Sequence, residues 1–177
     1  MYGFAGGDPV NYQDPFGLKV EMGGLDRSQQ DRVRALIRSS SAFRRWFNAI
    51  DALPADQLTM TLGNATGDLV GRVQAAGDGF TFRGSRSGMI LFSTDANWAS
   101  QSEFESVVAH EFAHAAAGLR NGTPATCYDA KAGGRGPEDC AVTEQNTVHG
   151  QIGYRNRSSY EDTGPFKSSG SEEKKKP

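Results

Sequence analysis

The sequence predicts an α+β domain, because its hydrophobic periodicity changes along the chain from helical to strand-like and back to helical. Apolar residues recur at helical spacing in residues 26–53, short strand-like stretches follow in 58–92, and helical spacing returns after residue 97. A chain of 177 residues suits one domain with short appendages. The folded body is expected to span residues 19–166, between a turn-rich segment at 1–18 and a polar, disordered tail at 167–177.

The first element of this body is an N-terminal helix over residues 26–53, with Asp26 as its N-cap. The three consecutive serines at 39–41 can divide it into two helices. Its core-facing residues are expected to be Val33, Leu36, Ile37, Phe43, Phe47 and Ile50.

A small antiparallel sheet is predicted next. In residues 58–62, Leu and Met alternate with Thr, as in a half-buried strand. Residues 69–75 and 80–83 flank Gly77-Asp78-Gly79, which is typical of a hairpin turn. Residues 89–92 are uniformly apolar, which favours a strand that is buried on both faces or lies beside the functional site.

Two more helices complete the predicted fold. Ser100 and Glu103 form a capping-box pattern at the start of the first, and Gly118 or Gly122 is expected to end it. After a glycine-rich loop, the last helix begins at Pro137, since proline suits the first helical position.

Charge and hydropathy argue against two kinds of partner, nucleic acids and membranes. The chain has 19 Lys plus Arg and 21 Asp plus Glu, a net charge of −2, whereas an electrostatic nucleic-acid binder shows a basic excess. No apolar run reaches the roughly 20 residues that a membrane-spanning helix needs. Residues 1–7 do not resemble a signal peptide. We therefore expect neither a nucleic-acid partner nor a membrane span.

The main functional motif lies in the predicted helix after residue 97. His110 and His114 are four residues apart, so both imidazoles lie on one helix face and can bind one ion. Catalytic zinc accepts such nitrogens and keeps a position for water, from which Glu111 can take a proton. The strand predicted at 89–92 could then form the edge along which an extended peptide binds.

A third ligand is expected downstream, among Glu138, Asp139, Glu144 and His149. On a helix over 137–152, Glu138 falls on the apolar stripe, whereas Asp139 and Glu144 point about 100° or more away from it. A carboxylate on an apolar face is costly unless it is paired or binds metal, so Glu138 is preferred; the alternative is an acid that stabilises the first helical turn. We interpret His149 as a packed or hydrogen-bonded residue. The stripe consists of Ala141, Val142, Gln145, Val148, His149 and Ile152.

The two cysteines, Cys127 and Cys140, bracket the loop before this helix. Two thiols cannot complete a Cys-rich zinc site. They form either a disulfide that positions Glu138 or two free thiols, and the sequence leaves both open.

Residues 2–18 read YGFAGGDPVNYQDPFGL and end in D-P-x-G-L. This segment resembles the end of the core domain in bacterial Rhs/YD-repeat polymorphic toxins, where the signature closes a shared shell and a variable toxin follows. The resemblance implies that the shell cleaves itself after Leu18, with Asp8 and Asp14 as the aspartates involved. Without the shell, the chain is not expected to cleave itself.

A second resemblance concerns the rest of the chain. The stretches VVAHEFAHA (107–115), EDCAV (138–142) and NTVH (146–149), then Gly153 and RSSY (157–160), resemble zinc metallopeptidase toxin domains at Rhs C-termini, which are similar to the M91 type of secreted effector peptidases. His149 stands where Arg is usual, and Gln145 where an acid often precedes the Asn.

This second resemblance implies a minimal zincin-like fold that binds one zinc ion. His110, His114 and Glu138 would be the ligands, and Glu111 the general base. Arg157 and Tyr160 would either contact the substrate or a developing oxyanion, or pack the C-terminal segment.

Together these features predict a zinc metalloendopeptidase toxin that is released from an Rhs protein in interbacterial competition or host attack. It would be a secreted effector, delivered for example by type VI secretion, and would act in the target-cell cytoplasm rather than the periplasm. Its partners would be a protein substrate, a cognate immunity protein and the remaining Rhs shell. The alternatives are a metal-stabilised binding module and a zinc amidohydrolase acting on peptidoglycan.

Overall fold

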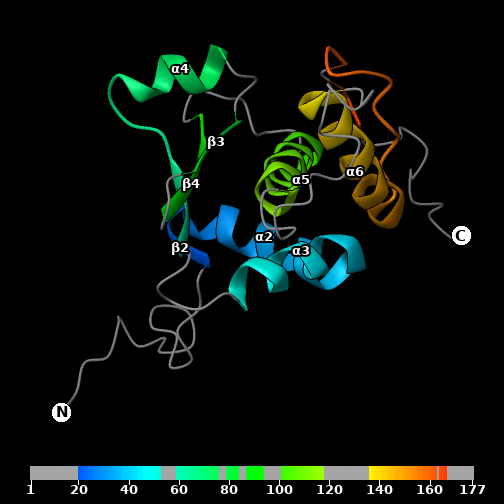
Figure 1. The fold of residues 1–177 in the computed structure, drawn as a ribbon, viewed down its shortest axis with the longest axis horizontal. Helices are drawn as coiled ribbons and strands as arrows, with labels where there is room; N and C mark the ends of the chain where they lie inside the picture. Colours follow the sequence, from blue (N-terminus) through cyan, green and yellow to red (C-terminus); the bar gives the residue numbers. More distant parts are fainter. Residues whose placement is uncertain are drawn as a thin grey trace, which may run out of the picture.

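A computed structural model describes residues 20–52, 59–75, 79–83, 87–93, 101–117, 136–162 and 164–166. These residues form helices α2–α6 and strands β1–β4, which confirms the α+β class (Figure 1). None of the described helices is both long and apolar enough to cross a membrane. The shell-like segment at 1–18 and the tail at 167–177 lie outside the described residues.

The predicted N-terminal helix is two helices, α2 (Arg27–Ser39) and α3 (Ser41–Asp51). The Asp26 carboxylate accepts from the Gln29 backbone N–H at 2.9 Å, and the Gln29 side chain accepts from the Asp26 N–H at 3.0 Å, a reciprocal capping box. The break falls at Ser40, whose backbone is extended and whose hydroxyl accepts from the Phe43 N–H at 3.0 Å. A residue that caps a new helix cannot continue the old one, so the expected division is confirmed.

The four strands form one mixed sheet in the order β1 (Val20–Gly24), β2 (Thr59–Asn64), β4 (Ser87–Phe92) and β3 (Gly79–Arg83). Strands β1, β2 and β4 are parallel, and only β3 pairs antiparallel with β4. The prediction of an antiparallel sheet is therefore wrong for most of it. The helices α2 and α3 connect β1 to β2, and such a crossover returns the chain in the same direction.

Residues 69–75, expected to be a strand, form helix α4 (Leu69–Ala75). Val73 is buried, whereas Gly71 and Arg72 on other faces of the helix are exposed, as on a short helix with one face inward. Strand β3 consequently pairs with β4 rather than with residues 69–75. In the predicted turn, Gly77 and Asp78 lie outside the described residues.

Strand β4 lies inside the sheet, between β2 and β3. Ile90 and Phe92 are fully buried, whereas Met89 is 36% exposed, so the apolar run is buried on one face and not on both. Because both edges of β4 are hydrogen-bonded, it cannot be the edge to which a peptide adds. Among the strands that the structure describes, β3 is the edge strand on this side of the sheet.

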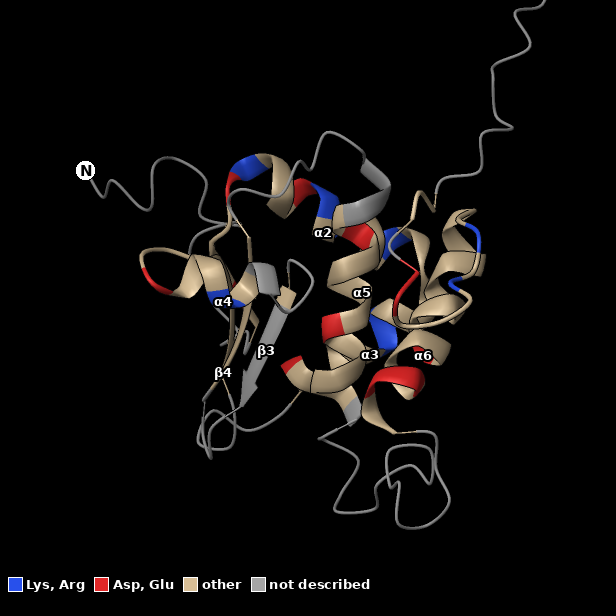
Figure 2. Cartoon of the chain, turned by 90° about the horizontal axis from the view of Figure 1, so that it is seen from above, with Lys and Arg blue, Asp and Glu red and all other residues tan. Residues whose placement is uncertain are grey.

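Helices α5 (Gln101–Ala117) and α6 (Pro137–Ile152) carry the predicted motif and the predicted third ligand. Helix α5 lies between β3 on one side and α6 on the other (Figure 2). The start of α6 at Pro137 is as expected, and the helix ends at Gly153, whose positive φ of 77° favours glycine. The predicted caps of α5 at Ser100, Gly118 and Gly122 lie outside the described residues.

An aromatic cluster fixes α5 against α3. The Phe112 ring lies 4.7 Å from the Phe43 ring and 6.1 Å from the Phe47 ring, centroid to centroid, and Phe112 is fully buried. Truncating such a residue typically costs about 3–5 kcal/mol. Phe112 stands between the two motif histidines in sequence, so this packing also sets the position of the helix face that carries them.

Candidate metal centre

His110 and His114 lie one turn apart on α5, and their Nε2 atoms approach to 3.1 Å. The His110 side chain is 7% exposed and that of His114 is 20% exposed. Two imidazole nitrogens this close repel each other through their lone pairs unless a proton or a cation lies between them. The pair is thus arranged to share a positive charge.

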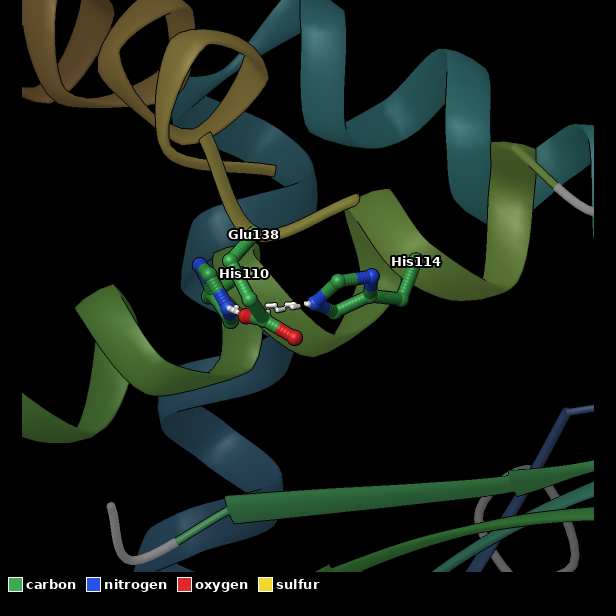
Figure 3. A group of neighbouring side chains, drawn as sticks. All are labelled: His110, His114 and Glu138. Atoms are coloured by element: carbon green, nitrogen blue, oxygen red, sulfur yellow. Dashed lines mark hydrogen bonds and ion pairs between the residues drawn. The ribbon is translucent and has the colours of Figure 1, made fainter. Parts of the chain in front are cut away.

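Glu138, in the first turn of α6, completes the group (Figure 3). Its Oε2 atom lies 3.1 Å from His110 Nε2 and 3.3 Å from His114 Nε2. These three residues could hold a metal ion. Among the described residues, Asp139 and Glu144 are not part of any such group. Of the carboxylates weighed from sequence, the packing of α6 on α5 brings Glu138 to the histidines.

The donor set fits zinc. Tetrahedral coordination at ligand distances of about 2.0–2.1 Å separates neighbouring ligand atoms by about 3.3 Å. The separations here are 3.1, 3.1 and 3.3 Å. Two neutral imidazoles and one carboxylate leave a fourth position for water or substrate, as in catalytic zinc sites.

The electrostatics of the group favour a bound cation. The contacts of Glu138 with the ring nitrogens of His110 and His114 hold the pKa of its carboxyl group well below the usual range, so it stays ionised. Burial lowers the pKa of His114, but the hydrogen bond to Glu138 and the charges of Glu111 and Glu138 outweigh burial and raise it. The negative charge around these nitrogens therefore attracts either protons or a metal.

Glu111 lies on a different face of α5, beside the start of strand β3. It is 6% exposed. A Cβ atom added to Gly79 would lie 3.0 Å from Glu111 Cγ, 3.1 Å from Glu111 Oε1 and only 2.4 Å from Val107 Cγ1. Only glycine lets the strand approach the helix this closely. Glu111, which follows His110 in the sequence, thus lies against strand β3. Sequence reasoning missed the role of Gly79, which only the packing of β3 on α5 reveals.

A buried polar network lies behind His110. Its Nδ1 atom is 3.3 Å from Gln145 Oε1, and the Gln145 amide also contacts Ser106 and Arg157. His149, one of the four candidate third ligands, is not in the metal group; its ring nitrogens contact the Arg155 carbonyl oxygen at 2.8 Å and Ser106 Oγ at 3.1 Å. This agrees with its interpretation as a hydrogen-bonded histidine. The sequence predicts Gln145 on the apolar stripe of this helix. A buried amide there needs hydrogen-bond partners, and this need is the sequence feature that indicates a buried polar network.

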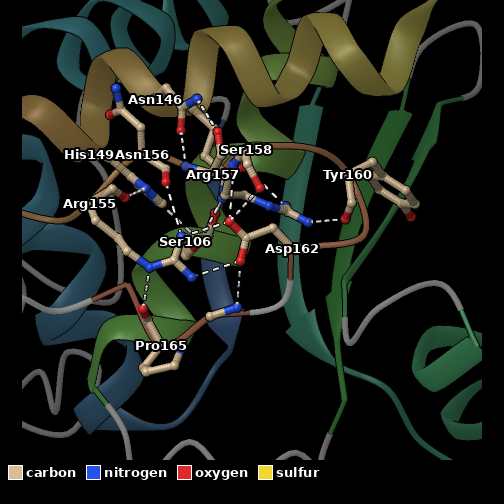
Figure 4. Close-up of polar contacts among 12 residues, drawn as sticks. Ser106, Asn146, His149, Arg155, Asn156, Arg157, Ser158, Tyr160, Asp162 and Pro165 are labelled. Atoms are coloured by element: carbon tan, nitrogen blue, oxygen red, sulfur yellow. Dashed lines mark hydrogen bonds and ion pairs between the residues drawn. The ribbon is translucent and has the colours of Figure 1, made fainter.

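Arg157 and Tyr160 belong to the segment that follows α6 (Figure 4). The Tyr160 ring lies 5.7 Å from the His110 ring and is 37% exposed. Arg157 Nη1 donates to Gln145 Oε1 at 3.1 Å, and Nη2 donates to the Tyr160 carbonyl oxygen. The structure thus places Tyr160 beside the metal group, whereas the guanidinium of Arg157 contacts the residue behind His110.

One set of contacts holds this segment on α6, and a second set ties the segment to itself. Asn146 exchanges a pair of hydrogen bonds with the Arg157 backbone, at 2.7 and 2.9 Å. Arg155 binds both carboxylate oxygens of Asp162 at 2.6 and 2.7 Å, and Asp162 accepts from the Ser158 N–H at 3.0 Å. Tyr160, between these anchors, is thereby positioned by residues on both sides of it.

Cys140 is buried and disulfide-bonded, which decides one alternative that the sequence left open. The other cysteine of the chain, Cys127, lies outside the described residues. The same is true of Asp8, Asp14 and Leu18 of the predicted self-cleavage signature.

Comparison with known proteins gave no matching family model, no matching curated protein and no matching solved structure. The chemistry of the metal group is therefore inferred from the contacts among its own residues.

Proposed function

We propose that the chain is a zinc-dependent metalloendopeptidase toxin domain. The observation that carries this proposal is the convergence of His110 Nε2, His114 Nε2 and Glu138 Oε2 within 3.3 Å of one another. Glu111, a buried carboxylate on the next face of the same helix, supports hydrolysis rather than a purely structural metal site.

In this function His110, His114 and Glu138 hold the metal. A zinc ion held by these residues would lower the pKa of a water molecule and would polarise a carbonyl group. The Glu111 carboxylate takes the proton from the attacking water and then gives it to the leaving amine, so that the peptide bond breaks without release of a strongly basic amide ion.

The free edge of β3 is the proposed binding edge for the substrate. No described strand pairs with its outer N–H and C=O groups, which can therefore hydrogen-bond an extended peptide. Strand β3 lies against α5 (Figure 2). A Cβ atom added to its first residue, Gly79, would lie 3.1 Å from Glu111 Oε1. Partial burial and the charges of Glu138 and Glu111 raise the pKa of Tyr160, so its hydroxyl stays protonated and can donate to a developing oxyanion.

The Rhs-like signature supports delivery as a secreted effector. We propose that residues 1–18 connect the domain to an Rhs shell, that cleavage after Leu18 releases it, and that it acts in the target-cell cytoplasm. A cognate immunity protein in the producing cell would then be its protective partner. Co-expression with the neighbouring open reading frame should abolish toxicity if that frame encodes the partner.

The decisive experiment compares Glu111→Gln and Glu138→Gln with wild type. We expect wild-type protein to bind one zinc, Glu111→Gln to keep it, and Glu138→Gln to lose most of it. Mapping of new protein N-termini in expressing cells should reveal cleavage by wild type, and about 10²–10⁴-fold less cleavage by Glu111→Gln. Asp139→Asn is the matched control, since Asp139 is exposed in the same helical turn.

The outcomes separate the rival functions. Toxicity that persists in Glu111→Gln without new N-termini would indicate a metal-stabilised binding module. If toxicity requires Glu111 and the cells release peptidoglycan fragments without forming new protein N-termini, the domain is an amidohydrolase. Absence of bound zinc in the wild-type protein would overturn the metal centre itself.

A further inference from the structure

The Gln145 side chain is fully buried between α5 and α6 and makes several hydrogen bonds. Its Oε1 atom lies 3.1 Å from Arg157 Nη1 and 3.3 Å from His110 Nδ1. Its Nε2 atom lies 2.8 Å from the Ser106 carbonyl oxygen and 2.5 Å from Ser106 Oγ. Each end of this amide therefore has partners of its own.

Chemistry dictates which end of the amide faces which partner. A guanidinium can only donate hydrogen bonds, so the atom that contacts Arg157 must be the Gln145 oxygen. A backbone carbonyl can only accept, so the atom that contacts the Ser106 carbonyl must be the Gln145 nitrogen. These two constraints agree, and they leave His110 Nδ1 facing an oxygen.

An oxygen acceptor requires that His110 carry its proton on Nδ1. The lone pair of the neutral ring then lies on Nε2, where in metal-free protein it accepts from the Nε2–H of His114, 3.1 Å away, and that N–H also faces Glu138 Oε2 at 3.3 Å. We propose that Gln145 is a positioning residue that holds His110 in the Nδ1–H tautomer, with Arg157 and Ser106 fixing its amide. This rests on the proposed metal function, because only a ring with a free Nε2 lone pair can bind the ion at that atom.

The same logic extends to the far end of the network. The Arg155 carbonyl can only accept, so His149 Nδ1 donates to it and His149 Nε2 accepts from the Ser106 hydroxyl. The Ser106 oxygen then accepts from Gln145 Nε2. All donors from His110 to His149 thus point in one direction, and no member can reverse alone without leaving a buried polar group unpaired.

Arg157 then acts on the metal ligand rather than on the substrate. Its guanidinium contacts Gln145 and a backbone carbonyl, on the side of His110 away from Glu138. Loss of the partner that orients a metal-binding histidine typically costs about 10–100-fold in metal affinity.

The test has one measurement without metal and one with it. In metal-free protein at about pH 8.5, where an ordinary histidine is neutral, two-bond ¹H–¹⁵N spectra report which ring nitrogen of His110 is protonated. We expect the Nδ1–H tautomer in wild type and in Gln145→Glu, whose carboxylate still accepts from Nδ1. In Gln145→Met, which has nearly the same shape but no oxygen, the Nε2–H tautomer should appear.

Competition of the same proteins with a zinc chelator gives the second measurement. Gln145→Met should bind zinc about 10–100-fold more weakly, and Gln145→Glu should recover most of this loss. Gln29→Met is the matched control, because Gln29 is a buried amide that bonds Asn64 far from the metal group and should affect stability only.

Two results would overturn the proposal. One is an Nε2–H tautomer of His110 in wild type, a result that does not depend on whether Gln145→Met folds. The other is unchanged zinc affinity in folded Gln145→Met. Neither is the same as failure of the proposed function, which shows itself as wild-type protein that binds no zinc.

Discussion

Replacing Gly79 by alanine tests whether the close approach of β3 to α5 is required for activity. The added Cβ would lie 2.4 Å from Val107 Cγ1, about 1 Å less than an ordinary van der Waals contact allows. Valine is held in one rotamer in a helix, so the strand or the helix must move instead. Overpacking of this kind costs about 1–3 kcal/mol of stability.

The same shift should reduce catalysis more than metal binding. Glu111 Cγ and Oε1 are the next atoms that the new methyl group meets, at 3.0 and 3.1 Å. A displacement of about 1 Å in a reacting group can lower the rate about 10²-fold. His110 and His114 lie on another face of α5 and are not among these contacts, so zinc affinity should stay near the wild-type value.

The assay measures urea unfolding, bound zinc and the appearance of new protein N-termini for Gly79→Ala. The control is Gly71→Ala in α4, where nothing lies within 4 Å of the added methyl group. In a helix interior that change should stabilise by up to about 1 kcal/mol and leave cleavage intact. Full stability and full activity in Gly79→Ala would refute the requirement for a close approach.

The structure also predicts how acidification, disulfide reduction and the substitution Asp162→Asn affect stability or local opening. Burial lowers the pKa of His149 to about 4, so between pH 6.5 and 4 the unfolded chain binds a proton that the folded chain does not. The free energy of unfolding should fall by on the order of 3 kcal/mol as pH drops through this window, and His149→Gln should flatten that part of the urea-unfolding profile. Reducing the disulfide at Cys140 should lower stability by about 2–4 kcal/mol, the typical contribution of a disulfide, and a cysteine-free variant should be insensitive to reductant. Asp162→Asn removes the charge that Arg155 binds and should speed amide exchange in residues 155–162 without changing zinc affinity.

Local patterns predicted the elements that carry the candidate site. His110 and His114 are related by helical spacing alone, and Pro137 begins α6 because of its own backbone chemistry. Glu138 followed from the helix face on which it lies. Each of these inferences needed only residues within a few positions of one another.

Features that depend on distant parts of the chain were not predictable in this way. Alternation in a strand reports burial and not direction, so it could not show that β2 pairs parallel with both β1 and β4. Strand β1 ends in two glycines and has no clear alternation. The roles of Gly79 and Gln145 arise where α5 meets β3 and α6, and no spacing in the sequence encodes those contacts.

The two metal-binding helices also have a consequence for the order of assembly. His110 and His114 come together as soon as α5 forms, whereas Glu138 joins them only when α6 docks, after a connection of nearly twenty residues. A chain in which α6 has not docked on α5 therefore holds only the two histidines of the candidate metal group. Under the proposed function, the free energy of zinc binding would favour the docking of α6 on α5. Under the proposed function, a chain that enters a cell unfolded would stay inactive until α6 docks on α5.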